Sequence, residues 1–282
     1  MIFSCLSPVD LANFSLTCRT AYNSVKAFSR LAYDIRKLLS RYFPEDQIDA
    51  FRYLQDRTRT LISGSTALQF FDRTYYEGSD LDLYVEERHA KEVLYFIRDK
   101  GYVFDPRDGQ PKDLDDAIDY AADDPYRHQD GPEYAELVNA ISAVFNFSQN
   151  GKKVQVITSR WTDSPLSIVL SFHSSVLPFL FGSVFDAHLS YLLACVMQVI
   201  SARHAISLYP LATFGQRQSL IMDTGRDIEA PLQKYAKRGW SIMGESDCRR
   251  AGLRYRWSQN GCFRRVGDRF LLDHPTRSSI YR

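Results

Sequence analysis

The chain has 282 residues, a net charge of +1 and 45% hydrophobic residues, which is the composition of a folded globular protein. The near-zero net charge argues against binding of nucleic acid or membranes through a uniformly charged surface. The five cysteines are scattered and form no Cys-x-x-Cys pair, which argues against a disulfide framework and a zinc knuckle and fits a reducing compartment.

We predict no targeting or membrane-spanning segment. The N-terminus lacks the basic and then apolar layout of a signal peptide. The apolar run over residues 166–185 is interrupted by His173 and Pro178, which favours a core helix over a membrane span. We therefore expect a cytoplasmic or nuclear protein without a membrane partner.

The first 50 residues are predicted to be helical. Ser7 followed by Pro8 is a helix-start signal, because serine caps the first turn and proline fits its first position. The segment is similar to the second half of an F-box at Leu6, Pro8, Asp10, Leu11, Leu16, Cys18 and Arg19. This resemblance implies docking onto the linker subunit of a cullin ubiquitin ligase. The alternative is an ordinary helical hairpin packed on the main domain.

Residues 51–165 are predicted to form the central α/β core. Leu61 and Ile62 indicate the end of a buried strand, Gly64-Ser65 a tight turn, and residues 66–71 the first turns of a helix. Backbone N–H groups at such a helix start, together with the positive end of the helix dipole, suit a phosphate group.

A second strand is predicted over residues 80–85, where carboxylate and apolar side chains alternate. Because side chains in a strand have a period of two, Asp80 and Asp82 should share one face. Two neighbouring carboxylates repel each other unless a cation lies between them, so the pair suits a divalent metal ion. The alternative is a solvated edge strand that follows a glycine turn.

These two segments resemble the signature of the nucleotidyltransferase superfamily, which has the polymerase-beta-like fold. The signature stands here as Ile62-Ser63-Gly64-Ser65 followed by Asp80-Leu81-Asp82-Leu83. The run Gly64–Leu68, with Arg73, is also similar to the branch that contains abortive-infection toxins. The resemblance implies an α+β fold with a mixed sheet flanked by helices. It also implies a nucleoside triphosphate with Mg²⁺ or Mn²⁺, Asp80 and Asp82 as catalytic and metal-binding residues, and Gly64, Ser65 and Thr66 as ligands of the phosphates.

The third carboxylate of this superfamily commonly lies on a later strand. Residues 140–158 are predicted to form a hairpin, because apolar positions alternate on both sides of Asn150-Gly151, a type I′ turn sequence. The corresponding polar position of the returning strand is Gln155. Glutamine is neutral and a poor base, so the resemblance leaves open an inactive form of the fold. Asp163, a few residues later, is the candidate substitute.

Between these strands we expect a helix over residues 86–100, an extended piece at 102–104 and an acidic insertion over 105–136. The insertion is punctuated by proline and glycine, with one short helix over 113–121. Its ordinary interpretation is a solvated loop. The alternatives are an acidic lid over the site or a mimic of nucleic acid that regulates it.

Residues 166–282 are predicted to be a helical region with a basic tail. Ser164-Pro165 starts an apolar helix, and a second helix is expected from about Ala187 to Arg203. In the superfamily, helices after the catalytic core often bring basic and aromatic side chains to the nucleotide, and on that resemblance the candidates are Tyr209, Arg217 and Tyr235. The tail combines arginine with aromatic residues, which suits a nucleic acid, and the alternative is that the tail packs against the acidic insertion.

Three functions remain open from the sequence. The first is a metal-dependent nucleotidyltransferase that transfers a nucleotide from a nucleoside triphosphate to an RNA, protein or small-molecule acceptor. The second is a catalytically inactive binding module on the same fold, acting as an F-box-type adaptor of a ubiquitin ligase. The third is a toxin-like transferase or kinase, which shares the site of the first and differs in its acceptor.

Overall fold

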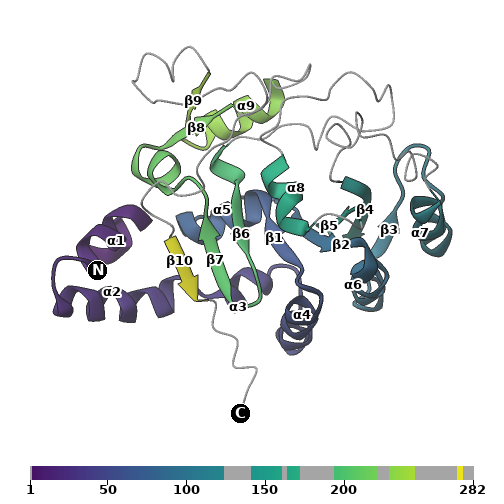
Figure 1. Ribbon diagram of the computed structural model, residues 1–282, viewed down its shortest axis with the longest axis horizontal. Helices are drawn as coiled ribbons and strands as arrows, with labels where there is room; N and C mark the ends of the chain where they lie inside the picture. Colours follow the sequence, from purple (N-terminus) through teal and green to yellow (C-terminus); the bar gives the residue numbers. More distant parts are fainter. Residues whose placement is uncertain are drawn as a thin grey trace, which may run out of the picture.

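The computed structural model describes residues 2–123, 141–160, 164–171, 194–221, 229–244 and 272–275. In this part of the chain, eight strands form one mixed sheet in the order β10-β7-β6-β1-β2-β5-β4-β3, with helices packed against it (Figure 1). The α+β fold class predicted from the sequence is therefore confirmed. The strands of this sheet are β1 (Leu61–Ser63), β2 (Leu81–Glu86), β3 (Val103–Asp105), β4 (Ile141–Gln149), β5 (Lys152–Ser159), β6 (Gln198–Ile200), β7 (His204–Ser207) and β10 (Leu272–Pro275).

The helices are distributed along the whole described chain. The α-helices are α1 (Pro8–Ser15), α2 (Arg19–Ala32), α3 (Ile35–Leu39), α4 (Glu45–Thr58), α5 (Gly64–Asp72), α6 (Glu87–Asp99), α7 (Leu114–Ala122), α8 (Pro165–Ser171) and α9 (Glu229–Lys237). Shorter elements are the 3-10 helices η1 (Ile2–Cys5) and η3 (Ala194–Val196), the π-helix η4 (Leu211–Gly215), and a parallel pair of strands, β8 (Gln218–Leu220) and β9 (Ser241–Met243).

The centre of the sheet consists of β1, β2 and β5. Strand β1 runs antiparallel to β2 with Ser63 opposite Asp82, and β2 runs parallel to β5 with Asp82 opposite Gln155. Residues that are distant in the sequence are therefore placed side by side at one end of these strands. This register positions the candidate site.

The two faces of the sheet are buried by different helices. The alternation of β2 sends Leu83 into the larger core, where it meets side chains of α5 and α6. It sends Tyr84 into a smaller cluster with Ile157 and with Ile168 of α8. Burial of both faces explains why β2 alternates between apolar and polar residues only near its start.

The N-terminal helices follow the caps that the sequence predicts. Ser7 caps α1, and its hydroxyl accepts from the Asp10 N–H while the Asp10 carboxylate accepts from the Ser7 N–H. This reciprocal capping box satisfies two backbone donors that would otherwise lack partners. Figure 1 shows α1 and α2 together at one end of the molecule. The helical expectation for residues 1–50 is confirmed for residues 2–50.

Other local predictions are also confirmed. The hairpin β4–β5 turns at Asn150 and Gly151, whose φ angles of +50° and +77° fit a type I′ turn. The helix expected over residues 86–100 corresponds to α6, the extended piece at 102–104 overlaps β3, and the short helix of the acidic insertion is α7.

The prediction of a helical region over residues 166–282 is wrong for much of what the structure describes. Strands β6, β7 and β10 extend the main sheet, and β8 and β9 form the small second sheet. The helix expected from about Ala187 to Arg203 is wrong for residues 198–200, which form β6. A short apolar run is compatible with either a helix or a buried strand, and here pairing of Ile200 with Ile62 of β1 decides for the strand.

Helix α4 holds the turn between β6 and β7 in place. The buried Arg52 donates to the carbonyls of Ser201, at 3.3 Å, and Ala202, and the Gln55 amide donates to the Ile200 carbonyl at 3.0 Å. On the surface, Arg203 makes two hydrogen bonds to the Asp56 carboxylate. These contacts satisfy backbone carbonyl groups at the end of β6 and in the turn that follows it.

Several sequence-based expectations lie outside the described residues. They concern the acidic insertion from residue 124 onward, Asp163, His173, and the basic tail over 245–271 and 276–282.

Candidate functional site

The tight turn at Gly64 lies directly against the carboxylate of Asp82. A Cβ atom added to Gly64 would lie 2.1 Å from the Asp82 Oδ2 atom, and the Gly64 φ angle is +69°. Both observations require glycine at this position, since any side chain would collide with the carboxylate. The structure thus brings together Gly64 and Asp82, the central residues of the two predicted segments.

Asp80 is positioned through its backbone. The Thr66 hydroxyl donates to the Asp80 carbonyl at 2.6 Å, and the Tyr42 hydroxyl donates to the Ser79 carbonyl at 2.9 Å and lies 2.8 Å from the Thr66 hydroxyl. Thr66 is fully buried. Its hydroxyl is therefore engaged in orienting the Asp80 segment, whereas the sequence predicts that Thr66 contacts the phosphates.

The start of α5 has backbone donors without a side-chain cap. Ser63 is the N-cap residue, but its hydroxyl donates to the Gln198 carbonyl at 2.6 Å, and no side chain caps the helix. Ser65 follows in the first turn and is buried. N–H groups at a helix start attract anions, as the sequence predicts for Gly64 and Ser65.

Burial, and secondarily the charge of Asp80, raises the pKa of Asp82 to about 8. Because the charge of Asp80 contributes to this pKa shift, the two carboxylates repel each other electrostatically. The nearby Lys234 of α9 opposes the shift, and burial followed by the positive charge of Arg238 lowers the pKa of Lys234 itself.

Gln155 stands beside Asp82 on the neighbouring strand, where the resemblance places the third carboxylate. Its amide nitrogen donates to the Asn146 side-chain oxygen at 2.8 Å. This bond directs the amide nitrogen toward β4. Gln155 adds no negative charge to the Asp80–Asp82 pair.

Arg217 lies at the other end of α5 from Gly64. Its guanidinium forms an ion pair with Asp72 at 2.5 Å and stacks on the Trp240 ring, with 4.3 Å between the guanidinium carbon and the ring centroid. Because a helix rises about 1.5 Å per residue, Asp72 is roughly 12 Å from Gly64 along α5. The structure therefore does not bring Arg217 together with the Asp pair, and its role as a nucleotide ligand stays a prediction.

Sequence reasoning named Tyr235 of α9 as a candidate but missed Lys234 and Arg238 near it. Lys234 acts on the Asp pair, while Arg238, one turn later, lies over the Tyr76 ring at 3.9 Å and near the ring of the buried Tyr235. The Arg238 Nη1 and Tyr76 hydroxyl atoms are buried without a hydrogen-bond partner in the described part of the chain. The available signal was the presence of two basic residues, Lys234 and Arg238, in the same short segment as Tyr235.

The two carboxylates of Asp80 and Asp82 are suitable ligands for a magnesium ion. Mg²⁺ in phosphate-transferring sites is commonly bound by one or two carboxylates, with phosphate oxygens and waters completing its ligands. Asp80 and Asp82 supply two carboxylates, and the Gly64 turn lies directly against that of Asp82. No group of three or more histidine, cysteine, aspartate or glutamate residues with metal-binding geometry occurs among the described residues.

Comparison with known proteins identifies one part of the chain. Residues 1–33 match the F-box domain family, so the N-terminal segment is F-box-like, as the sequence predicts. No curated protein and no solved structure shows significant similarity to the chain. Within the described residues, none of the helices has the length and apolar character needed to span a membrane.

Proposed function

We propose that this protein is an F-box-type adaptor whose N-terminal segment binds the linker subunit of a cullin ubiquitin ligase. The observation that carries the proposal is the F-box match over residues 1–33. In this proposal, the α+β part of the molecule presents a partner protein to the ligase.

The exposed apolar side chains of this segment support the proposal. Among the described residues, five exposed large hydrophobic side chains lie within the F-box match: Ile2, Phe14, Leu16, Tyr22 and Leu31. Leu16 and Leu31 are 76% and 83% exposed. Apolar surface concentrated in one short segment is typical of a protein interface.

The segment is also attached firmly to the rest of the molecule. Arg73, which follows α5, donates to the carbonyls of Phe3, at 3.3 Å, and Leu6, and its guanidinium lies over the Phe28 ring. Val9 packs into the main core. A rigid attachment would hold a bound partner in a constant orientation toward the ligase, which an adaptor requires.

We expect Leu16→Glu and Tyr22→Glu each to weaken binding of the linker subunit by at least about tenfold, equivalent to about 1.4 kcal/mol. A carboxylate would have to be desolvated in an apolar interface, whereas in the free protein both positions are exposed. Affinity would be measured by calorimetry with the full chain and the purified linker subunit.

The matched control is Tyr53→Glu. Tyr53 is 59% exposed on α4 and Tyr22 is 51% exposed on α2, so the two changes cost the free protein similarly while only one lies in the F-box match. Tyr53→Glu should bind like wild type. Absence of binding by the wild type, or equal affinities for the Tyr22 and Tyr53 variants, would refute the adaptor proposal.

A second function is favoured by the contact between Gly64 and the Asp82 carboxylate. We propose that Asp80 and Asp82 hold Mg²⁺ or Mn²⁺ and that the N–H groups at the start of α5 contact the phosphates of a nucleoside triphosphate. The metal ion would neutralise charge on the phosphates and on the leaving pyrophosphate. Lys234 of α9 would add positive charge beside the same site. The acceptor, an RNA or a protein, stays a prediction.

Calorimetric titration with ATP, GTP, CTP and UTP in the presence of Mg²⁺ tests this second function. We expect at least one nucleotide to bind, and the double substitution Asp80→Ala and Asp82→Ala to weaken that binding at least about tenfold. The control is Asp116→Ala with Asp119→Ala on α7, which removes the same charge from exposed positions. Metal-independent binding, or equal loss in both double variants, would contradict the proposed site.

A further inference from the structure

A cavity of about 420 Å³ lies on the face of the sheet that α8 covers in part. Helix α8 contacts β1, β2 and β5. The neighbouring strands β6 and β7 continue the same face beyond the helix. The cavity lies between the start of α8 and these strands, and its volume is within the range of about 300 to 1,000 Å³ that is typical of small-molecule sites.

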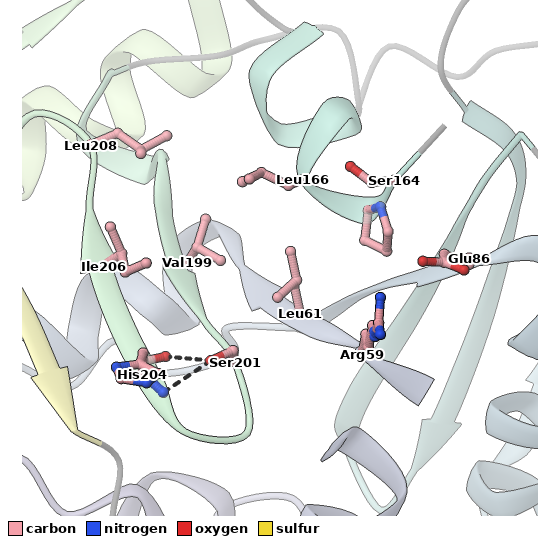
Figure 2. Close-up of a pocket in the computed structure, with 11 residues that line it drawn as sticks. Arg59, Leu61, Glu86, Ser164, Leu166, Val199, Ser201, His204, Ile206 and Leu208 are labelled. Atoms are coloured by element: carbon pink, nitrogen blue, oxygen red, sulfur yellow. Dashed lines mark hydrogen bonds between the residues drawn. The ribbon is translucent and has the colours of Figure 1, made fainter. Parts of the chain in front are cut away.

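The walls of the cavity are aliphatic. Leu61, Val199 and Ile206 form the floor, one from each of the adjacent strands β1, β6 and β7, and Val199 and Ile206 are directly paired. Figure 2 shows Leu166 of α8 across from them, and Leu208 at the far side. Such walls favour a hydrocarbon body over a polar one.

One end of the cavity is polar and is lined by one guanidinium and one carboxylate. Figure 2 shows Arg59 and Glu86 there, with Ser164 nearby. The Glu86 carboxylate forms an ion pair with Arg88 at 2.5 Å, so its charge is compensated. The Arg59 guanidinium has no ion-pair partner among the described residues.

The opposite end is formed by Ser201 and His204, and the Ser201 hydroxyl is engaged with the His204 backbone. The Ser201 hydroxyl donates to the His204 carbonyl at 3.0 Å and accepts from the His204 N–H at 2.9 Å. These are the dashed bonds in Figure 2. The Ser201 hydroxyl therefore does not require a charged group on the ligand, in contrast to the Arg59 guanidinium at the other end.

The cavity is separate from the Asp80–Asp82 pair. Asp82 and Glu86 lie on the same face of β2, four residues apart, which corresponds to roughly 13 Å along a strand. The buried Tyr84 lies between them on that face. A ligand in the cavity would thus not require the metal or phosphate chemistry proposed for the Asp pair.

We infer that this cavity binds a monocarboxylate with a hydrocarbon body of roughly 10 to 15 carbon atoms. The hydrocarbon would pack against Leu61, Val199 and Leu166, and the carboxylate would pair with Arg59. An Arg–carboxylate pair is favourable because the guanidinium fork matches the two carboxylate oxygens.

Titration of the full chain with decanoate, 1-decanol and decylamine tests the inference by calorimetry. Decanoate should bind at least tenfold more tightly than the alcohol or the amine. Arg59→Gln should abolish this preference while leaving binding of 1-decanol within about twofold, since the apolar walls are unchanged.

Two variants test the location of the ligand. Val199→Phe would fill the cavity from its floor, and Leu166→Trp would fill it from α8. Leu166 is 41% exposed, so this position tolerates a larger side chain better than the buried Val199 does. Each should weaken decanoate binding at least tenfold, while Val103→Phe on β3, at an exposed position outside the cavity, should not. The Asp80→Ala and Asp82→Ala double variant should bind decanoate normally.

No binding of decanoate, equal affinity for decanoate and 1-decanol, or wild-type affinity in a folded Leu166→Trp variant would overturn the inference. Loss of decanoate binding in the Asp80→Ala and Asp82→Ala double variant would also overturn it, because the ligand would then occupy the other site.

Discussion

Replacement of Arg52 by alanine should lower the free energy of unfolding by about 3 to 5 kcal/mol. Arg52 is 1% exposed and donates hydrogen bonds to the carbonyls of Ser201 and Ala202 and to the Gln55 side chain. The alanine variant removes the guanidinium donor from these acceptors and creates a cavity between α4 and the turn that joins β6 to β7. Both effects destabilise the folded state.

Arg203→Ala is the matched control for this prediction. Arg203 lies in the same turn and also binds α4, through Asp56, but its side chain is 68% exposed. Exposed ion pairs contribute about 0 to 1 kcal/mol, so the control should lose no more than that. Urea unfolding of both variants measures the difference. Equal losses in the two variants would show that burial of Arg52 is not what stabilises the turn.

The second large effect concerns pH. In metal-free protein, raising the pH from about 5 to about 8.5 should reduce the free energy of unfolding by about 2 to 4 kcal/mol through Asp82 alone. Burial, with the charge of Asp80, raises the pKa of Asp82 to about 8 in the folded state, whereas an aspartate in an unfolded chain titrates near pH 4.

The sign follows from proton binding. Between about pH 4 and pH 8, the folded state holds a proton on Asp82 that the unfolded state has released, so stability is greatest below this range and falls as the pH rises through it. At about pH 8, Mg²⁺ should restore part of the lost stability, because the cation would replace the proton between the carboxylates.

Thermal unfolding in EDTA and in Mg²⁺, measured across this pH range, tests the prediction. Asp82→Asn should flatten the pH dependence and abolish the effect of Mg²⁺, because asparagine neither titrates here nor supplies a carboxylate. Asp116→Asn, at an exposed position of α7, should behave like wild type. If Asp82→Asn keeps the wild-type pH dependence, another group accounts for it and the electrostatic account of the site fails.

Predictions based on local signals agree with the structure. The capping pair Ser7 and Asp10, the turn at Asn150-Gly151 and the turn at Gly64 each depend on interactions within a few residues. Amphipathic spacing likewise predicts α6, since its inward residues recur with the helix period. The F-box-like segment is recognisable for the same reason, because it is short and continuous in the sequence.

Predictions that depend on partners distant in the sequence were wrong or were not made. Residues 198–200 form a strand because β1, which lies more than a hundred positions earlier, provides an unpaired edge and because Arg52 and Gln55 hold the following turn. The secondary-structure propensity of residues 198–200 does not indicate whether such a partner strand exists. The same limit applies to Lys234 and Arg238, which the tertiary structure brings to the Asp80–Asp82 region and to Tyr76.

The sequence by itself determined where this chain turns, caps its helices and alternates carboxylates with apolar residues, since each of these is a property of a few neighbouring residues. It thereby predicted that Gly64 and Asp82 belong to one site. Only the tertiary structure decided that Asp82 is partly buried and lies against the Gly64 turn, that Thr66 orients the backbone of Asp80, and that an aliphatic cavity with Arg59 at one end lies on the same face of the sheet. Burial, pairing and cavities arise from surfaces that meet across the fold, and no local pattern specifies which surfaces these are.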